Sequence, residues 1–183
     1  MSGGKEVVSM KDKLLLESFC GDPSEVTYLA LEGLFFCSWY AQYNAAKKGA
    51  IERNGRKSFL KEFCTIKLCT ARQSGHTKAI ARLAVKYLDK VMFFCPNQGM
   101  MEHSKRMIET QLHDKDIRCI KPYHIEFDDS VFELRTFNCT HAIVGHDVEA
   151  IIVDGTFALS EAKINALYDY PVVKFPFFYI FAE

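Results

Sequence analysis

The stretch that decides the fold is LCTARQSGHTK, which runs from Leu68 to Lys78. It follows a strand predicted over residues 63–69. It precedes a helix predicted over residues 77–89, in which apolar residues recur every three or four positions. A loop between a strand and a helix directs backbone N–H groups at the helix N-terminus, where the helix dipole adds about half a positive charge. The stretch therefore predicts a phosphate-binding loop.

The loop departs from the usual phosphate-binding pattern, G-x-x-x-x-G-K-[ST], at two positions. Gly75 matches the second glycine, and Thr77 matches the hydroxyl residue that contacts magnesium. Thr70 replaces the first glycine, and His76 occupies the lysine position. An imidazole is shorter than a lysine side chain and mostly neutral at pH 7, so it does not replace the lysine's charge. The loop is expected to hold phosphate chiefly through its backbone.

The rest of the chain alternates between strands and helices. Strands are predicted over residues 91–95, 117–120, 132–137, 141–144, 150–154 and 177–181, and helices over residues 100–112 and 160–168. The runs at 91–95 and 150–154 are continuously apolar, as expected for strands covered on both faces. This alternation predicts an α/β fold with a mostly parallel sheet flanked by helices.

A small N-terminal helical segment, residues 1–60, is expected to pack on an α/β core, residues 61–183. Its longer helix is predicted to begin at Asp22 or Ser24, either of which can cap it, and to end near Gly49. The predicted core face of this helix consists of Val26, Leu29, Ala30, Leu34, Cys37, Tyr40 and Ala41. The aromatic residues from Phe35 to Tyr43 are predicted to pack against the next layer, with a base-stacking surface as the alternative.

Three segments, in the same order, resemble those of a known family. Ala71-Arg72-Gln73-Ser74-Gly75, followed by Thr77, resembles the variant phosphate loop of bacteriophage large terminases, which are DNA-packaging motors, and of related helicase-like ATPases. FFCPNQ, residues 93–98, is similar to the next strand and loop of these motors. AIIVD, residues 150–154, resembles their second nucleotide motif, which ends in a magnesium-binding aspartate. The resemblance covers residues 63–183 and implies a P-loop NTPase fold.

The resemblance also implies a site and its cofactors, ATP and Mg²⁺. Magnesium would be held by Thr77 and Asp154. In the family a glutamate that positions the attacking water follows the aspartate, whereas here that position is Gly155. The phosphates would be bound by the loop residues Arg72, Gln73, Ser74, Gly75, His76, Thr77 and Lys78, of which Arg72 and Lys78 are the cations that could partly replace the missing lysine.

Two alternatives for the function follow. In the first, the chain is a degenerate P-loop protein of phage origin that binds ATP and Mg²⁺ with little or no hydrolysis. Losing one group that stabilises phosphoryl transfer typically costs on the order of 10² to 10³ in rate, and here both the lysine and the glutamate are replaced. In the second, it is a non-enzymatic interaction or inhibitor protein that uses the P-loop fold only as a scaffold.

Charge is balanced overall but unevenly distributed. The chain has 23 basic and 23 acidic residues, which argues against a histone-like nucleic-acid binder. Between Lys47 and Lys78, however, nine basic residues stand against two acidic ones. The first five of these are the candidate nucleic-acid contacts: Lys47, Lys48, Arg53, Arg56 and Lys57. The expected partners are a nucleotide and either DNA or a protein of a nucleic-acid machine, unless these charges lie on separate solvated faces.

Cysteine usage and hydropathy indicate an intracellular protein. The seven cysteines include no C-x-x-C pair, and most lie in apolar runs, which is typical of buried, reduced thiols. The first residues lack the apolar stretch of a secretion signal. The longest apolar run is too short to span a bilayer. The sequence therefore predicts no membrane partner and a cytoplasmic location, the host cytoplasm if the gene belongs to a phage.

Overall fold

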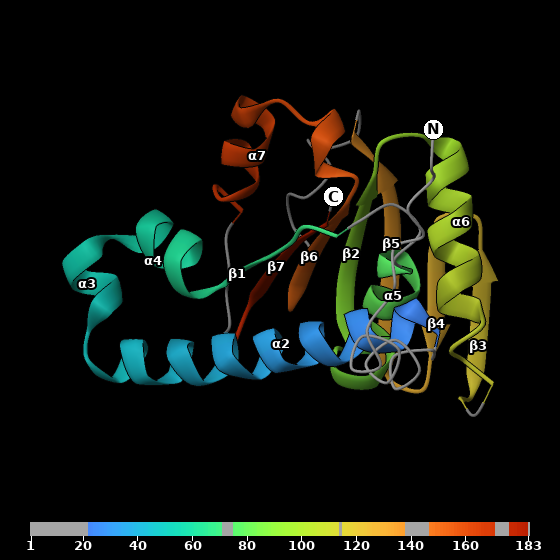
Figure 1. Cartoon of the computed structure of the whole chain (residues 1–183), viewed down its shortest axis with the longest axis horizontal. Coiled ribbons are helices and arrows are strands. Elements are labelled where there is room, and N and C mark those ends of the chain that lie inside the picture. The colour runs from blue at the N-terminus through green and yellow to red at the C-terminus, as the bar shows by residue number, and fades with distance from the viewer. Residues whose placement is uncertain (1–21, 71–74, 114, 138–146, 171–175, 183) are drawn as a thin grey trace, which may run out of the picture.

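The architecture of the chain is an open seven-stranded sheet with helices on both faces (Figure 1). The computed structural model describes residues 22–70, 75–113, 115–137, 147–170 and 176–182. The strand predicted over residues 141–144 lies outside this range. Among the described residues, no helix is long and apolar enough to cross a membrane.

The sheet has the order β1-β7-β6-β2-β5-β4-β3. Its first five strands in this order are parallel, and β4 and β3 extend it as antiparallel strands. The strands are β1 (Thr65–Leu68), β2 (Lys90–Cys95), β3 (Ile117–Lys121), β4 (His124–Phe127), β5 (Ser130–Thr136), β6 (Ala150–Asp154) and β7 (Phe178–Ala182). This confirms the predicted mostly parallel α/β sheet.

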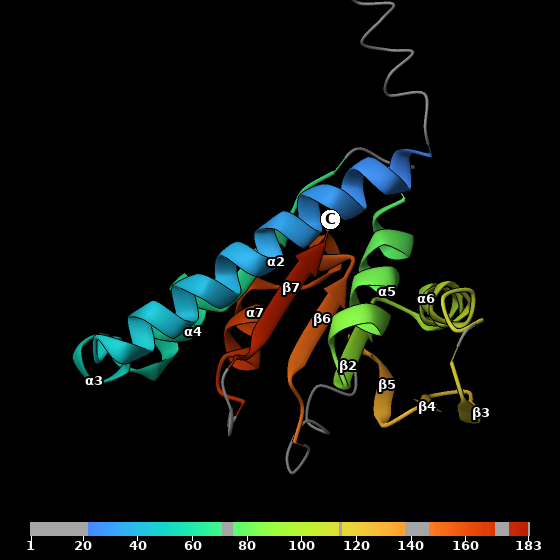
Figure 2. The ribbon, with the colours of Figure 1, turned by 90° about the horizontal axis from the view of Figure 1, so that it is seen from below.

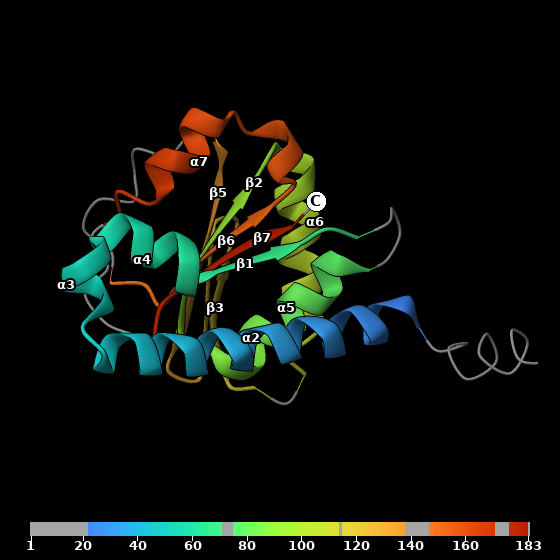
Figure 3. The ribbon, with the colours of Figure 1, turned by 60° about the vertical axis from the view of Figure 1, so that its left-hand side comes forward.

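Two hydrophobic layers cover the sheet because side chains alternate between its faces along each strand. On one face pack α2 (Pro23–Lys47), α5 (His76–Tyr87) and α6 (Gln98–Glu109). On the other pack α3 (Ala50–Asn54), α4 (Arg56–Phe63) and α7 (Glu161–Leu167), which follows a short 3₁₀ turn, Thr156–Ala158. Figure 3 shows the strands between these two groups of helices.

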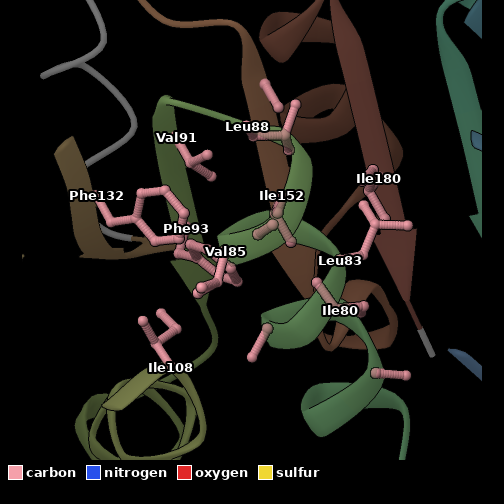
Figure 4. Packing of buried hydrophobic residues seen from close by; sticks show 14 of the residues in the cluster. Ile80, Leu83, Val85, Leu88, Val91, Phe93, Ile108, Phe132, Ile152 and Ile180 are labelled. Atoms are coloured by element: carbon pink, nitrogen blue, oxygen red, sulfur yellow. The ribbon is translucent and has the colours of Figure 1, made fainter. Parts of the chain in front are cut away.

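The central strand β2 illustrates this alternation. Phe93 belongs to the layer under α5 and Phe94 to the layer under α7, and both are fully buried. Figure 4 shows Phe93 packed beside Val85 of α5 and Phe132 of β5. The central strands β2 and β6 are thus covered by side chains on both faces of the sheet.

The helix α2 begins where the sequence predicts, but it buries a different face. Asp22 is its N-cap, with a carboxylate oxygen that accepts a hydrogen bond from the Ser24 N–H at 2.9 Å. The predicted core residues Leu29 and Tyr40 are 58% and 72% exposed. The buried residues of α2 are Ser24, Thr27, Tyr28, Leu31, Phe35, Gln42 and Ala45.

The polar groups on the buried face of α2 are hydrogen-bonded. The Thr27 hydroxyl donates to the Pro23 carbonyl at 3.1 Å, and the Gln42 Oε1 accepts from the Phe177 N–H at 3.0 Å. Burying these polar groups therefore leaves them paired. Phe35 stacks on Phe178 of β7 with 4.3 Å between ring centroids, so it packs as predicted. Phe36, Trp39, Tyr40 and Tyr43 remain exposed, contrary to the prediction.

Candidate functional site

The carboxyl edge of the parallel strands brings the predicted metal ligands together. Leu68, the last residue of β1, is aligned with Ala182 of β7, which is aligned in turn with Asp154, the last residue of β6. The loop after β1 therefore leaves the sheet at the level of Asp154. It returns as α5, whose second residue is Thr77.

Asp154 is the centre of a buried hydrogen-bond cluster. Its carboxylate is held at 1% residue exposure on the α5 face of the sheet. The Thr77 hydroxyl donates to Oδ2 at 2.9 Å, and the Ser104 hydroxyl of α6 donates to the same oxygen at 3.3 Å. His76 Nε2 lies 3.1 Å from Oδ1. Both carboxylate oxygens thus have partners, as burial of a charge requires.

The imidazole of His76 turns back onto Asp154. Its Nδ1 lies 3.4 Å from the Thr70 hydroxyl, so the ring bridges the end of β1 and the end of β6. The hydrogen bond to Asp154 raises the pKa of His76 above 6.5, and the carboxylate's charge adds to this, while partial burial opposes it. The cationic form of His76 is therefore stabilised by Asp154.

Gly75 gives the loop a conformation that other residues rarely adopt. It precedes α5 with φ +72°, in the left-handed region, and a Cβ there would lie 2.5 Å from the Cβ of Ser24. Next to this contact, Lys78 pairs with Asp22, the N-cap of α2. The start of α5 is thus fixed against the start of α2.

The N-terminus of α5 has the geometry of an anion site. The Ala79 N–H donates to the Gly75 carbonyl at 2.9 Å, which is the first bond of the helical pattern. The N–H groups of His76, Thr77 and Lys78 precede that bond and are not used within the helix. Arg72, Gln73 and Ser74 lie outside the described residues, so their contribution remains a prediction.

Gly155 occupies the position where the family's glutamate is expected. It has φ +87°, its N–H donates to the Ala182 carbonyl at 3.0 Å, and a Cβ there would lie 2.7 Å from Cγ of Pro96. A larger side chain would therefore have to displace the Pro96 ring. The described neighbours of Asp154 that accept or donate hydrogen bonds are a threonine, a serine and a histidine, with no second carboxylate among them.

Sequence reasoning missed Ser104 and the docking of α2 on the loop. Ser104 is fully buried and also lies 3.5 Å from the Cys95 thiol, whose pKa burial raises to about 12. Serine in a helix has no motif that marks it as a partner of a distant aspartate. Ser104 is brought to Asp154 by the sheet order, because α6 packs on β2, which is the neighbour of β6.

The candidate nucleic-acid residues divide into two groups. Lys47, Lys48 and Arg53 are exposed near the junction of α2 and α3. The Arg56 Nη2 donates to the Tyr170 carbonyl at 3.3 Å, and Lys57 pairs with Asp169 at 2.7 Å. Two of the five thus contact the segment after α7, and the role of all five in nucleic-acid binding remains a prediction.

A separate cavity of about 410 Å³ opens on the face of the sheet that α7 covers. Its lining includes Lys61, Lys67, Thr156 and Tyr168, and it does not include His76, Thr77 or Asp154. This cavity is therefore distinct from the Asp154 cluster.

Comparisons with known proteins support the fold through structure rather than through sequence. No family model and no curated protein sequence matches the chain. The large terminase of the thermophilic bacteriophage D6E superposes with a TM-score of 0.56 at 10% identity, over 67% of this chain and 34% of that one. The ATPase domain of the Thermus phage P74-26 large terminase gives 0.47 at 11% identity, over 73% and 62%.

A third match is the genome-packaging motor assembly of bacteriophage phi-29, with a TM-score of 0.47 at 12% identity, over 70% of this chain and 46% of that one. This chain spans about a third of the length of the D6E enzyme. The likeness to the D6E enzyme shows that the chain has a terminase-like, P-loop NTPase-like core fold.

Proposed function

We propose that this chain binds a magnesium-bound nucleoside triphosphate at the carboxyl edge of its sheet and hydrolyses it slowly or not at all. The observation that supports this most directly is the contact between the Thr77 hydroxyl and the Asp154 carboxylate, 2.9 Å apart at the N-terminus of α5. Phosphates bind naturally to such helix N-termini. The protein that shares this fold is the large terminase of the bacteriophage D6E.

The side chains at this point fit magnesium. Mg²⁺ prefers oxygen ligands and keeps several waters, with one or two carboxylates supplied by the protein. Thr77 and Asp154 provide a hydroxyl and a carboxylate, and both are buried. Bound magnesium would neutralise phosphate charge there. Among the described residues, no three side chains of His, Cys, Asp or Glu form an alternative metal cluster.

The same geometry argues for slow hydrolysis. His76 directs its Nε2 at Asp154, at 3.1 Å, and thus donates to the protein's own carboxylate. Gly155 offers no side chain to orient an attacking water. Each missing group is worth roughly 10² to 10³ in rate, so we expect the isolated chain to turn over ATP slowly.

The proposed partner of the bound state is DNA or a protein of a nucleic-acid machine. Lys47, Lys48 and Arg53 supply exposed positive charge at the far end of α2. Contacts to phosphates release counterions, so binding that uses these cations weakens steeply as salt is added. Fluorescence anisotropy with labelled DNA at increasing salt tests this part. A lack of binding at low salt would leave a protein as the partner.

Calorimetric titration with magnesium-ATP tests the site itself. Wild-type protein should bind, and Thr77→Val and Asp154→Asn should each weaken binding by about tenfold or more, because a charge-assisted contact contributes roughly 1.5–3 kcal/mol. Asp129→Asn, at an exposed turn, is the matched control and should bind like the wild type. Equal affinity in all four proteins would show that the assigned ligands are wrong.

A gain-of-function variant makes the same experiment informative if the wild type binds weakly. His76→Lys restores an ammonium group at the loop position, and we expect it to tighten binding by about tenfold. His76→Gln keeps a polar side chain without the charge and should not. If neither the wild type nor His76→Lys binds, the scaffold alternative replaces the nucleotide-binding one, and the exposed apolar face of α2 is the observation that favours it.

A further inference from the structure

The outward face of α2 has a regular apolar stripe. We call Val26, Leu29, Gly33, Phe36, Tyr40, Tyr43 and Lys47 the outer stripe; they are spaced alternately three and four residues apart. This is the spacing of the a and d positions of a coiled coil, where each apolar side chain meets a facing helix. The stripe lies opposite the buried residues Tyr28, Leu31 and Phe35. Helix α2 is therefore apolar on two sides.

Most of the outer stripe is exposed in the described part of the chain. Its five apolar side chains are 39% to 72% exposed, with Phe36 lowest and Tyr40 highest. The Phe36 ring also meets Tyr87 of α5 edge to face, with 5.3 Å between ring centroids, and the Lys47 ammonium lies 4.1 Å from the centroid of the Tyr43 ring. Figure 2 views the molecule from below and shows α2 in front of β7, with no described element in front of it. A contiguous row of exposed apolar side chains usually marks an interaction surface.

The outer stripe has small side chains in its N-terminal half and large ones in its C-terminal half. This order is complementary to a second copy of the stripe in the opposite direction. If two α2 helices pair antiparallel about a two-fold axis between Gly33 and Phe36, the ring of Phe36 faces the notch left by Gly33. Nothing lies within 4 Å of the position that a Cβ of Gly33 would occupy. Leu29 then faces Tyr40, and Val26 faces Tyr43. Each small residue meets a large one, as interdigitating helices require.

Charge also favours the antiparallel arrangement. Asp22 and Glu25 lie at the N-terminus of α2, and Lys47 and Lys48 at its C-terminus. Antiparallel pairing brings the acidic end of one helix to the basic end of the other and opposes the two helix dipoles. Asp22 and Glu25 also pair with Lys78 and Arg82 of α5, so the match in size is the stronger argument.

The surface available is adequate for a modest dimer. Phe36, Trp39, Tyr40 and Tyr43 are aromatic side chains of roughly 150–250 Å² each, and 39% to 72% of each is exposed. With Val26 and Leu29 they supply several hundred Å² per copy, approaching the roughly 800 Å² per partner of a standard interface. We propose that the outer stripe joins two copies of this chain through antiparallel α2 helices.

The first experiment measures mass in solution. Sedimentation equilibrium of the full chain, from micromolar to hundreds of micromolar, should give twice the chain mass of 20.9 kDa at the upper end. Trp39 is the only tryptophan and is 48% exposed beside the stripe, so its emission should shift to the blue as the dimer forms. A mass of one chain at every concentration would overturn the proposal.

Paired charge substitutions test the register. Leu29→Glu and Tyr40→Lys should each raise the dimer dissociation constant by about tenfold or more, because each buries an unpaired charge. The double variant L29E/Y40K should regain the dimer, since Leu29 faces Tyr40 of the other copy. Ile120→Lys, at an exposed position of β3, is the matched control and should dimerise like the wild type. Single variants that dimerise normally, or a double variant that stays monomeric, would contradict the arrangement.

Oxidative cross-linking distinguishes the antiparallel dimer from other pairings and from other ligands of the outer stripe. Cys37 has an exposed free thiol flanking the stripe, and in this register Ala30 of the second copy is its neighbour. Ala30→Cys should therefore yield a covalent dimer whose peptide map joins position 30 to position 37, and Cys37→Ser should abolish that link. Links of 30 to 30, or quenching of Trp39 by single-stranded DNA without any dimer, would overturn the proposal in favour of another pairing or another ligand.

Discussion

Gly75 lies where the start of α5 meets the start of α2. Its positive φ sets the entry into α5, and its missing Cβ leaves room for Ser24 of α2. Both requirements exclude a side chain for different reasons, one conformational and one steric. Gly75 is thus a structural residue of the site as well as a motif residue.

We expect Gly75→Ala to destabilise the protein by about 2 kcal/mol or more. The left-handed conformation costs an L-residue roughly 1–2 kcal/mol, and the added methyl group would lie 2.5 Å from the Cβ of Ser24. Gly99→Ala in the first turn of α6 is the matched control, because its Cβ would meet nothing closer than 3.4 Å. Urea unfolding followed by circular dichroism measures both. A Gly75→Ala midpoint equal to the wild type would show that α2 does not press on the loop.

The sequence predicted the motif residues of the site but not the residues that hold them. Thr77 and Asp154 could be proposed from the sequence because each stands at a fixed place relative to a strand or a helix, and the structure brings them within 2.9 Å of each other. Other contacts form only when distant elements pack together: Ser104 with Asp154, Ser24 with Gly75, and Lys78 with Asp22. No local sequence pattern predicts such contacts. The hydrogen bond between His76 and Asp154 likewise joins residues far apart in the sequence.

At the scale of elements, Glu32 connects α2 to α5. Its carboxylate accepts hydrogen bonds from the Tyr28 hydroxyl, from the Tyr87 hydroxyl at 2.6 Å and from Lys86 at 3.1 Å. The hydrogen bond from Tyr28 is the largest cause that lowers the pKa of Glu32 from 4.5 to about 2, followed by those from Tyr87 and Lys86. Glu32 therefore contributes to the pH dependence of folding.

The stability that Glu32 supplies should be present above pH 4.5 and lost as the pH falls towards about 2, because its pKa is lower in the folded than in the unfolded chain. Urea midpoints measured across this range should fall less steeply for Glu32→Gln than for the wild type. Glu102→Gln on α6, where Gln98 donates to the exposed carboxylate, should retain the wild-type slope. Parallel profiles for all three proteins would show that Glu32 does not link the helices.

Elements with strong periodicity were predicted well, and those whose form depends on packing were not. The strand predicted at 150–154 coincides with β6, and the strand at 91–95 and the helix at 77–89 match β2 and α5 to within two residues at either end. Helix α4 and strand β4 were missed, because RKSFLKEF and HIEF are short and mixed in polarity. The face of α2 was wrong because a helix that is apolar on two sides carries no signal to choose between them.

At the scale of the whole molecule, charge balance sets the solution behaviour. The formal net charge is +0 at pH 7 with the six histidines neutral. A protein without net charge lacks the repulsion that keeps copies apart, so association through an apolar surface is least opposed there.

We expect static light scattering to show the most attractive interactions near pH 7 and increasing repulsion on either side. The double variant Lys105→Glu/Lys115→Glu lowers the net charge by four at exposed or half-buried positions and should move the minimum to lower pH. A minimum that stays in place despite the altered charge would show that charge balance does not govern association.

Both edge strands of the sheet have features that oppose the growth of fibres. Strand β1 offers only four residues with Lys67 exposed among them, and β3 has an irregular register between Ile117 and Cys119 with Arg118 and Lys121 exposed. Short length, bulges and charge all prevent strands of separate molecules from adding to one another. Edge-to-edge addition of sheets from separate molecules is therefore disfavoured. Copies of this chain would then meet through a helix surface and not through a sheet edge.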